Sequence, residues 1–136
     1  MKIFFTEKDN AAVGKRVRAV GMCYFSGNDL SVGKVYTLKR NKANKNDTNC
    51  LEIREVVRPR AVINREIAKL ISPLLDNGKL HNADCEVIEE AKWSRGDTRT
   101  PARAHKVKVG ITFTDKADPE IQRLLELLKK EYKQES

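Results

Sequence analysis

Two adjacent aromatic residues and an amide-rich segment are the parts of this sequence best suited to chemistry. Tyr24 and Phe25 precede a Ser-Gly pair, and an exposed aromatic ring can stack on a nucleic-acid base of any type. Residues 41–49 hold four Asn and one Asp, which is Asp47. These side chains can hydrogen-bond a sugar or a nucleic-acid backbone. They can also merely close turns through their own backbone, and the sequence leaves both interpretations open.

Basic residues stand on both sides of this segment. Lys39, Arg40 and Lys45 lie in or beside it, and Arg58 and Arg60 flank a proline after the next apolar stretch. If the fold brings the two basic groups together, they can neutralise the phosphates of a nucleic acid. An ordinary solvated surface is the alternative interpretation.

The two rings must be assigned to faces. The chain from Lys15 to Phe25 begins with alternating basic and apolar residues and ends almost wholly apolar, which predicts a strand. Adjacent residues of a strand point to opposite faces, so one ring must enter the core. We expect Tyr24 to be the exposed ring, because its hydroxyl can stay hydrated, and Phe25 to be buried. Packing of Tyr24 within the fold is the competing interpretation.

A second aromatic residue, Trp93, opens a polar segment that contains Gly, Pro and further arginines. Arg95, Arg99 and Arg103 can grip a backbone while Trp93 supplies a second stacking ring. A flexible basic loop without a fixed role has the same composition.

Catalytic and metal-binding patterns are weak. His81 and Cys85 are four residues apart, but the segment lacks two more ligands for zinc. No nucleophile with a local base and no Gly-rich phosphate loop is found. Glu86, Glu89 and Glu90 form an acidic patch that can hold a divalent ion, so a metal-dependent nuclease is kept as an alternative. We expect no catalytic residue, no metal and no cofactor.

Length and composition favour one basic domain. The chain has 136 residues, enough for one hydrophobic core. Lys and Arg number 27 against 19 acidic residues, a net charge of +8, which favours a polyanionic partner. The three cysteines have no Cys-x-x-Cys spacing, and no apolar run is long enough for a signal peptide core or a membrane span. A reducing, cytoplasmic location is expected, with nucleoid association in a bacterium.

The remaining periodicities predict strands and two helices. Extended segments are expected at 32–38, 51–57, 84–92 and 106–114, the last with Val107, Val109, Ile111 and Phe113 on one face. Apolar spacing predicts one helix from Asn64 to Asn77, with Pro73 as a place where it kinks or ends early near Ser72. A second helix is expected at about 119–134, capped by Asp118.

Four pieces of the sequence resemble one known family. They are Tyr24-Phe25-Ser26-Gly27, Leu38-Lys39-Arg40-Asn41, residues 44–53 and Asn64-Arg65-Glu66-Ile67-Ala68. In this order and spacing they resemble a HIRAN domain, the module found in fork-remodelling DNA translocases and alone in many bacterial and phage proteins. The resemblance covers residues 17–80.

The resemblance implies a mainly β fold with two helices, a small six-stranded barrel of the OB-like or SH3-like kind, over the single domain 1–136. It also implies capture of the free 3′ end of single-stranded DNA, with the aromatic rings stacking on terminal bases and loop Asn and Asp groups holding the sugar hydroxyl. Two departures bear on 3′-end specificity. Lys45-Asn46 replaces the family's Pro-Tyr, and Val62 or Ala61 stands where translocase members carry a His.

The sequence therefore predicts a non-enzymatic module that binds single-stranded DNA or a DNA end, in replication or repair, and serves a helicase, translocase or nuclease partner. A protein-interaction module, using the stripe of Leu124, Leu125 and Leu128, is the first alternative, and the nuclease is the second. The expected DNA contacts are Tyr24, Phe25, Lys39, Arg40, Asn44, Lys45, Asn46, Asp47, Arg58 and Arg60.

Overall fold

The computed structural model describes residues 1–94 and 102–135. Its longest strand is β8 (Ala102–Thr112), which contains the clearest alternation of the sequence. The side chains of Val107, Val109, Ile111 and, just beyond the strand, Phe113 are fully buried. Such alternation places every second residue on the core face of a sheet. This prediction is confirmed.

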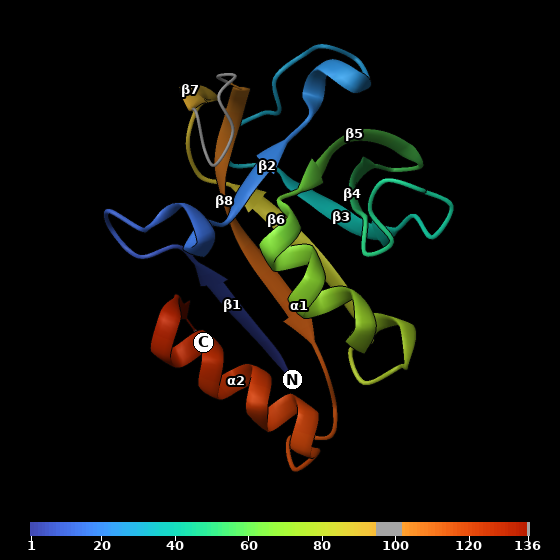
Figure 1. Ribbon diagram of the computed structural model, residues 1–136, viewed down its shortest axis with the longest axis vertical. Helices are drawn as coiled ribbons and strands as arrows, with labels where there is room; N and C mark the ends of the chain where they lie inside the picture. Colours follow the sequence, from blue (N-terminus) through green and yellow to red (C-terminus); the bar gives the residue numbers. More distant parts are fainter. Residues whose placement is uncertain (95–101, 136) are drawn as a thin grey trace.

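Strand β8 closes a six-stranded antiparallel barrel. The path runs from β2 (Arg18–Val20) through β5 (Arg58–Ile63), β4 (Leu51–Glu55), β3 (Val35–Arg40) and β6 (Asn82–Val87) to β8, which pairs again with β2. Closure removes the unpaired edges of the sheet. The expected mainly β barrel with two helices is confirmed (Figure 1).

Three further strands extend this barrel. β1 (Lys2–Thr6) pairs with the second half of β8, and β9 (Lys133–Glu135) pairs with β1. β7 (Lys92–Ser94) pairs with the start of β8. Neither β1 nor β9 is predicted by the sequence, because such short segments acquire strand structure only from the strands beside them.

Two helices bury apolar stripes against the barrel. α1 (Arg65–Asp76) buries Ile67, Ile71 and Leu74, and α2 (Pro119–Glu131) buries Ile121, Leu124 and Leu128. Figure 1 shows α2 lying along β1. The stripe of Leu124, Leu125 and Leu128, which the protein-interaction alternative would offer to a partner, belongs to the protein's own core, with Leu125 packed partly buried against it.

The ends of the helices differ in part from expectation. Asp118 caps α2 as predicted, accepting hydrogen bonds from the backbone of Glu120 and Ile121, but α2 ends at Glu131 rather than 134. Helix α1 continues past Pro73 to Asp76 with Asn77 at its C-cap, so the predicted end at Asn77 is confirmed and the alternative of an early end near Ser72 is wrong. Within residues 1–94 and 102–135, no helix is both long and apolar enough to span a membrane.

The strand expected from Lys15 to Phe25 is much shorter. The chain forms a single turn of 3-10 helix, η1 (Val13–Lys15), then β2, and then a second such turn, η2 (Met22–Tyr24). Gly21, between β2 and η2, has a φ of 75°, which ends the strand and starts the turn. The opposite-face argument for Tyr24 and Phe25 is therefore wrong, because neither residue is in a strand.

The extended segment expected at 51–57 ends at Glu55 in β4, and the chain from Arg58-Pro59-Arg60 onward forms β5. Pro59 lies opposite Arg54, at a register shift between Ile53 and Arg54 in β4. β2 pairs with β5 only at Val62 and Ile63, so the other side of Pro59 has no strand partner. Proline is tolerated in a strand at such bulges and edges, where its missing N–H is not needed.

Candidate nucleic-acid interface

Tyr24 and Phe25, which we call the aromatic corner, project from a tight turn after β2. The turn is closed by backbone hydrogen bonds from Phe25 and Gly27 to the carbonyl of Met22, whose side chain is buried. Tyr24 is 84% exposed and Phe25 36% exposed. The expected exposure of Tyr24 is confirmed and the expected burial of Phe25 is wrong, because a 3-10 turn does not alternate faces as a strand does.

The tyrosine ring lies against the backbone of Gly21. A Cβ atom at Gly21 would sit 3.4 Å from Cδ2 of Tyr24 and 3.5 Å from Cγ2 of Val62. Gly21 is suited to this position for two reasons: its φ is in the left-handed region, and the ring of Tyr24 approaches its backbone closely. The edge of the tyrosine ring and Val62 of β5 therefore both lie close to Gly21.

The second feature is the amide loop, residues 41–50, which its own side chains hold in shape. Oδ1 of Asn44 accepts hydrogen bonds from the backbone N–H groups of Asn46 and Asp47, at 2.9 and 3.1 Å. Oδ1 of Asp47 accepts from the N–H of Asn49 at 3.0 Å. These contacts are Asx turns, the local role that the sequence left open. They leave the side chains of Lys45 and Asn46 exposed.

Arg40 fastens the amide loop to helix α1. Its guanidinium donates to the carbonyls of Cys50 at 2.7 Å and Thr48 at 2.9 Å, and to the carboxylate of Asp76. The same hydrogen bonds hold the pKa of the Asp76 carboxyl below its ordinary value. Arg40 therefore shapes the loop rather than presenting free donors to a phosphate. Nothing in the local sequence indicates a contact between residues 36 positions apart.

Helix α1 holds the amide loop at two further points. Oγ of Ser72 donates to the carbonyl of Asn49 at 2.7 Å, and Nη2 of Arg65 donates to the carbonyl of Asn46 at 3.3 Å. Arg65 is exposed at the start of the helix. It is a cation beside the amide loop that no sequence pattern marks as a site residue.

A row of cross-strand neighbours joins the corner to the loop, and its central residue, Glu52, is buried. Val20 of β2 faces Val62 of β5, Val62 faces Glu52 of β4, and Glu52 faces Lys39 of β3. Nδ2 of Asn41, the first loop residue, donates to Glu52 at 2.9 Å. The aromatic corner and the amide loop thus border one face of the barrel, which we call the β2–β3 face.

The basic candidates divide into two kinds. The guanidinium of Arg60 donates to Glu55 at 2.8 Å, to Oγ of Ser26 and to the carbonyl of Asp29. It braces the loop after the aromatic corner. Lys39, Lys45 and Arg58 are exposed, so their charges are accessible to solvent. Of the two arginines flanking Pro59, one is therefore structural.

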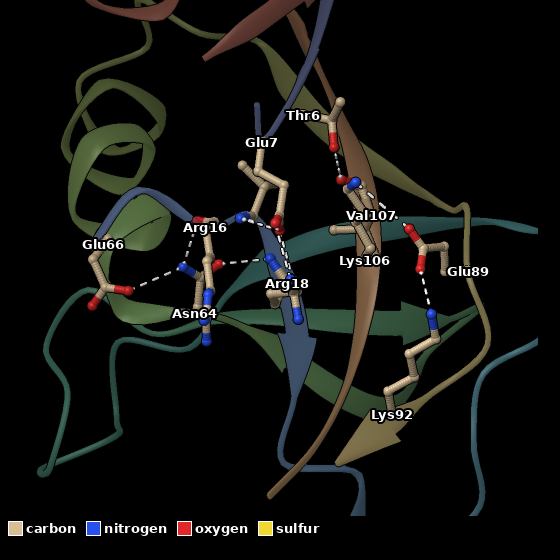
Figure 2. A network of polar contacts seen from close by, with 11 residues as sticks. Thr6, Glu7, Arg16, Arg18, Asn64, Glu66, Glu89, Lys92, Lys106 and Val107 are labelled. Atoms are coloured by element: carbon tan, nitrogen blue, oxygen red, sulfur yellow. Dashed lines mark hydrogen bonds and ion pairs between the residues drawn. The ribbon is translucent and has the colours of Figure 1, made fainter. Parts of the chain in front are cut away.

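A partly buried network of polar contacts holds β2, the strand that leads into the aromatic corner. Figure 2 shows Glu7 reaching Arg18 of β2, and Asn64 of the α1 N-terminus bridging to Arg18 and Glu66. Oδ1 of Asn64 accepts from the backbone N–H of Arg18 at 2.9 Å, and its Nδ2 donates to the carbonyl of Arg16 at 2.8 Å. Asn64 stands at the expected cap position, but its side chain ties β2 to the helix instead of capping it.

Two of the three glutamates considered for a nuclease site form ion pairs with lysines. Glu89 lies 3.2 Å from Lys92 and 3.5 Å from Lys106, as Figure 2 shows, and Glu86 lies 3.7 Å from Lys108. Across residues 1–94 and 102–135, no group of three or more His, Cys, Asp or Glu side chains is placed to hold a metal ion.

The HIRAN domain model matches residues 15–109, which include the aromatic corner, the amide loop and the whole β2–β3 face. The chain belongs to the HIRAN domain family. The resemblance seen in the sequence is confirmed. HIRAN domains are DNA-binding modules rather than catalytic ones, so membership supports nucleic-acid binding in general.

The fold of this HIRAN domain is also that of a solved relative. The crystal structure of the HIRAN domain of human HLTF superposes with a TM-score of 0.59 at 16% identity, covering 83% of this chain and 84% of that one. At this identity the likeness concerns the fold alone. No curated protein sequence matches the chain. At the position of the His in translocase members, Val62 is half-buried on the β2–β3 face and Ala61 is fully buried.

Proposed function

We propose that this HIRAN domain binds single-stranded DNA across the β2–β3 face and holds the strand end at the amide loop. The observation that carries the proposal is the placement of an exposed aromatic corner and a braced amide loop at the borders of one face. Bases can stack on Tyr24 and Phe25, while Lys39, Lys45 and Arg58 neutralise the backbone. The module would present a strand end to a helicase, translocase or nuclease partner in replication or repair.

End recognition rests on Asp47. A carboxylate near phosphates is repelled unless it meets a donor, and a free sugar hydroxyl is such a donor. Oδ1 of Asp47 already accepts from the N–H of Asn49, so the hydroxyl would meet the other carboxylate oxygen. Lys45-Asn46 offers neither a stiffening nor a stacking ring in the loop. We therefore expect a preference for a free 3′ end that is weaker than in translocase members.

The test compares single strands that differ only in their ends: 3′-hydroxyl, 3′-phosphate, 5′-phosphate and circular. We expect the 3′-hydroxyl strand to bind most tightly. Asp47→Asn keeps an acceptor for the N–H of Asn49 but removes the charge, whereas Asp47→Ala removes both. Both variants should reduce the preference for the hydroxyl, but only Asp47→Ala should also lower stability.

Equal binding of linear and circular strands would exclude end capture and leave general strand binding. A larger affinity for duplex than for single strands would contradict the proposal as a whole.

A further inference from the structure

A second exposed aromatic residue lies outside the β2–β3 face. Trp93 of β7 pairs in register with Arg103 of β8, and its ring is 67% exposed. The guanidinium carbon of Arg103 lies 5.6 Å from the ring centroid. An indole this exposed contributes little to the core, so the burial of apolar surface does not explain it. Contact with a cation orients the ring on the surface.

Arg103 also links Trp93 to the loop beside the aromatic corner. Its Nε and Nη2 donate to the two carboxylate oxygens of Asp29, at 3.2 and 2.5 Å. The carbonyl of Asp29 accepts from Arg60, whose Nε donates to Oγ of Ser26, the residue after Phe25. A continuous chain of contacts therefore runs from Trp93 to the aromatic corner.

The strand pairings place both aromatic sites at the same end of the barrel. The pairing of β8 with β2 includes the pair of His105 and Ala19, and Arg103 lies two residues before His105. β2 then leads directly into η2 and the corner. Figure 1 shows β7 and the loop that follows β2 at the same end of the molecule.

The surroundings of the ring favour a nucleic acid as its ligand. Arg103 touches the ring, and Lys92, next to it in β7, has a side chain that is 71% exposed. An aromatic ring bordered by cations matches a base and its neighbouring phosphates. Both cations are already paired with carboxylates, Arg103 with Asp29 and Lys92 with Glu89, so the exposed indole ring is the group left to bind a base.

We propose that Trp93 is a second base-stacking platform, which a single strand reaches after it passes the aromatic corner. This inference rests on the proposed function and extends it. A short strand is held by the corner and the amide loop alone. A longer strand also stacks on Trp93, with Arg103 holding the ring in place.

Trp93 is the only tryptophan of the chain, so its fluorescence reports on the site directly. The full chain is titrated with oligothymidylates of about 4 and about 12 nucleotides, which span the site sizes of one OB-like fold. We expect the longer strand to quench the emission of Trp93 at saturation and the shorter strand to change it little.

Affinities of variants complete the test. Trp93→Ala should weaken binding of the longer strand by about fivefold to 150-fold, as expected for removal of one stacking ring, and binding of the shorter strand by less than about twofold. Trp93→Phe should restore most of the affinity. Val57→Ala, at an exposed apolar residue of another hairpin, serves as the matched control and should change neither affinity.

The outcomes separate the two proposals. If Tyr24→Ala weakens both strands but Trp93→Ala weakens neither, or if the longer strand leaves the emission of Trp93 unchanged, the second platform is excluded and the proposed function stands. If the unmodified protein binds neither strand, the proposed function itself fails and the platform fails with it.

Discussion

The carboxylate of Glu7 and the guanidinium of Arg18 form a two-point ion pair, with Oε1–Nε at 2.6 Å and Oε2–Nη2 at 2.9 Å. Glu7 is only 4% exposed and also accepts from the backbone N–H of Val17 at 3.2 Å. The pair therefore ties the end of β1 to β2, the strand that leads into the aromatic corner. Losing one partner would leave the other poorly solvated.

Stability should fall in acid because of this pair. Burial by itself would raise the pKa of Glu7, but hydrogen bonds from Arg18 and Val17 and the charges of Arg18 and Lys106 outweigh it and lower the pKa below its ordinary 4.5. A depressed folded-state pKa contributes stability above the unfolded value, and this stability is lost as the pH falls through the folded value.

The measurement is the free energy of unfolding in urea between neutral pH and a pH well below 4.5. Glu7→Gln should cost about 1.5–3 kcal/mol at neutral pH and flatten the acid decline. Glu126→Gln, at an exposed residue of α2, should leave the profile unchanged. An identical acid decline in the Glu7 variant and the unmodified protein would show that other carboxylates control it.

Arg40 should matter for the amide loop more than for phosphate contact. Arg40→Ala removes its hydrogen bonds to Cys50, Thr48 and Asp76, so we expect a loss of about 1.5–3 kcal/mol and faster hydrogen exchange in the loop. Arg40→Lys should rescue little, because an ammonium cannot reproduce the planar fork. Lys42→Ala is the control, since Lys42 also lies near Asp76, at 3.6 Å, but has a largely exposed side chain. Equal losses in the Arg40 and Lys42 variants would refute this role.

Tyr24 should contribute to binding and not to folding. Its ring is 84% exposed, so Tyr24→Ala should leave the thermal midpoint nearly unchanged. The same change should weaken single-strand binding by about 1–3 kcal/mol, the range for one stacking ring. Tyr24→Phe keeps the ring and should bind almost normally. Fluorescence anisotropy of a labelled strand measures both variants, and undiminished binding by Tyr24→Ala would remove the corner from the site.

Binding should depend steeply on salt. Each phosphate neutralised on single-stranded nucleic acid releases about 0.7 counterion, so the logarithm of affinity falls linearly with the logarithm of salt concentration. Lys45→Ala and Arg58→Ala should each make the slope shallower by about 0.7. Lys116→Ala, at an exposed residue between β8 and α2, should not. A flat salt response in the unmodified protein would argue for a protein partner instead.

The sequence by itself determined the features that depend on near neighbours. The alternation from Val107 to Phe113 identified the buried face of β8, because the side-chain period of a strand is local. The Asp118-Pro119 pair identified the start of α2, because a cap and its N–H partners lie within three residues. The order of the aromatic pair, the amide loop and the helix start carried the family resemblance, and the family match confirmed it.

Only the tertiary structure decided what the candidate side chains do. Arg40 meets Asp76, Arg60 meets Ser26, and Arg103 meets Asp29, at sequence separations of 36, 34 and 74 residues. These contacts form only when the barrel closes, and the local secondary-structure propensity of the sequence does not predict how the barrel closes. Tyr24 and Phe25 were misassigned to a strand for the same reason. β2 ends where its pairing with β5 ends, and beyond that point the left-handed Gly21, not strand alternation, directs the rings outward.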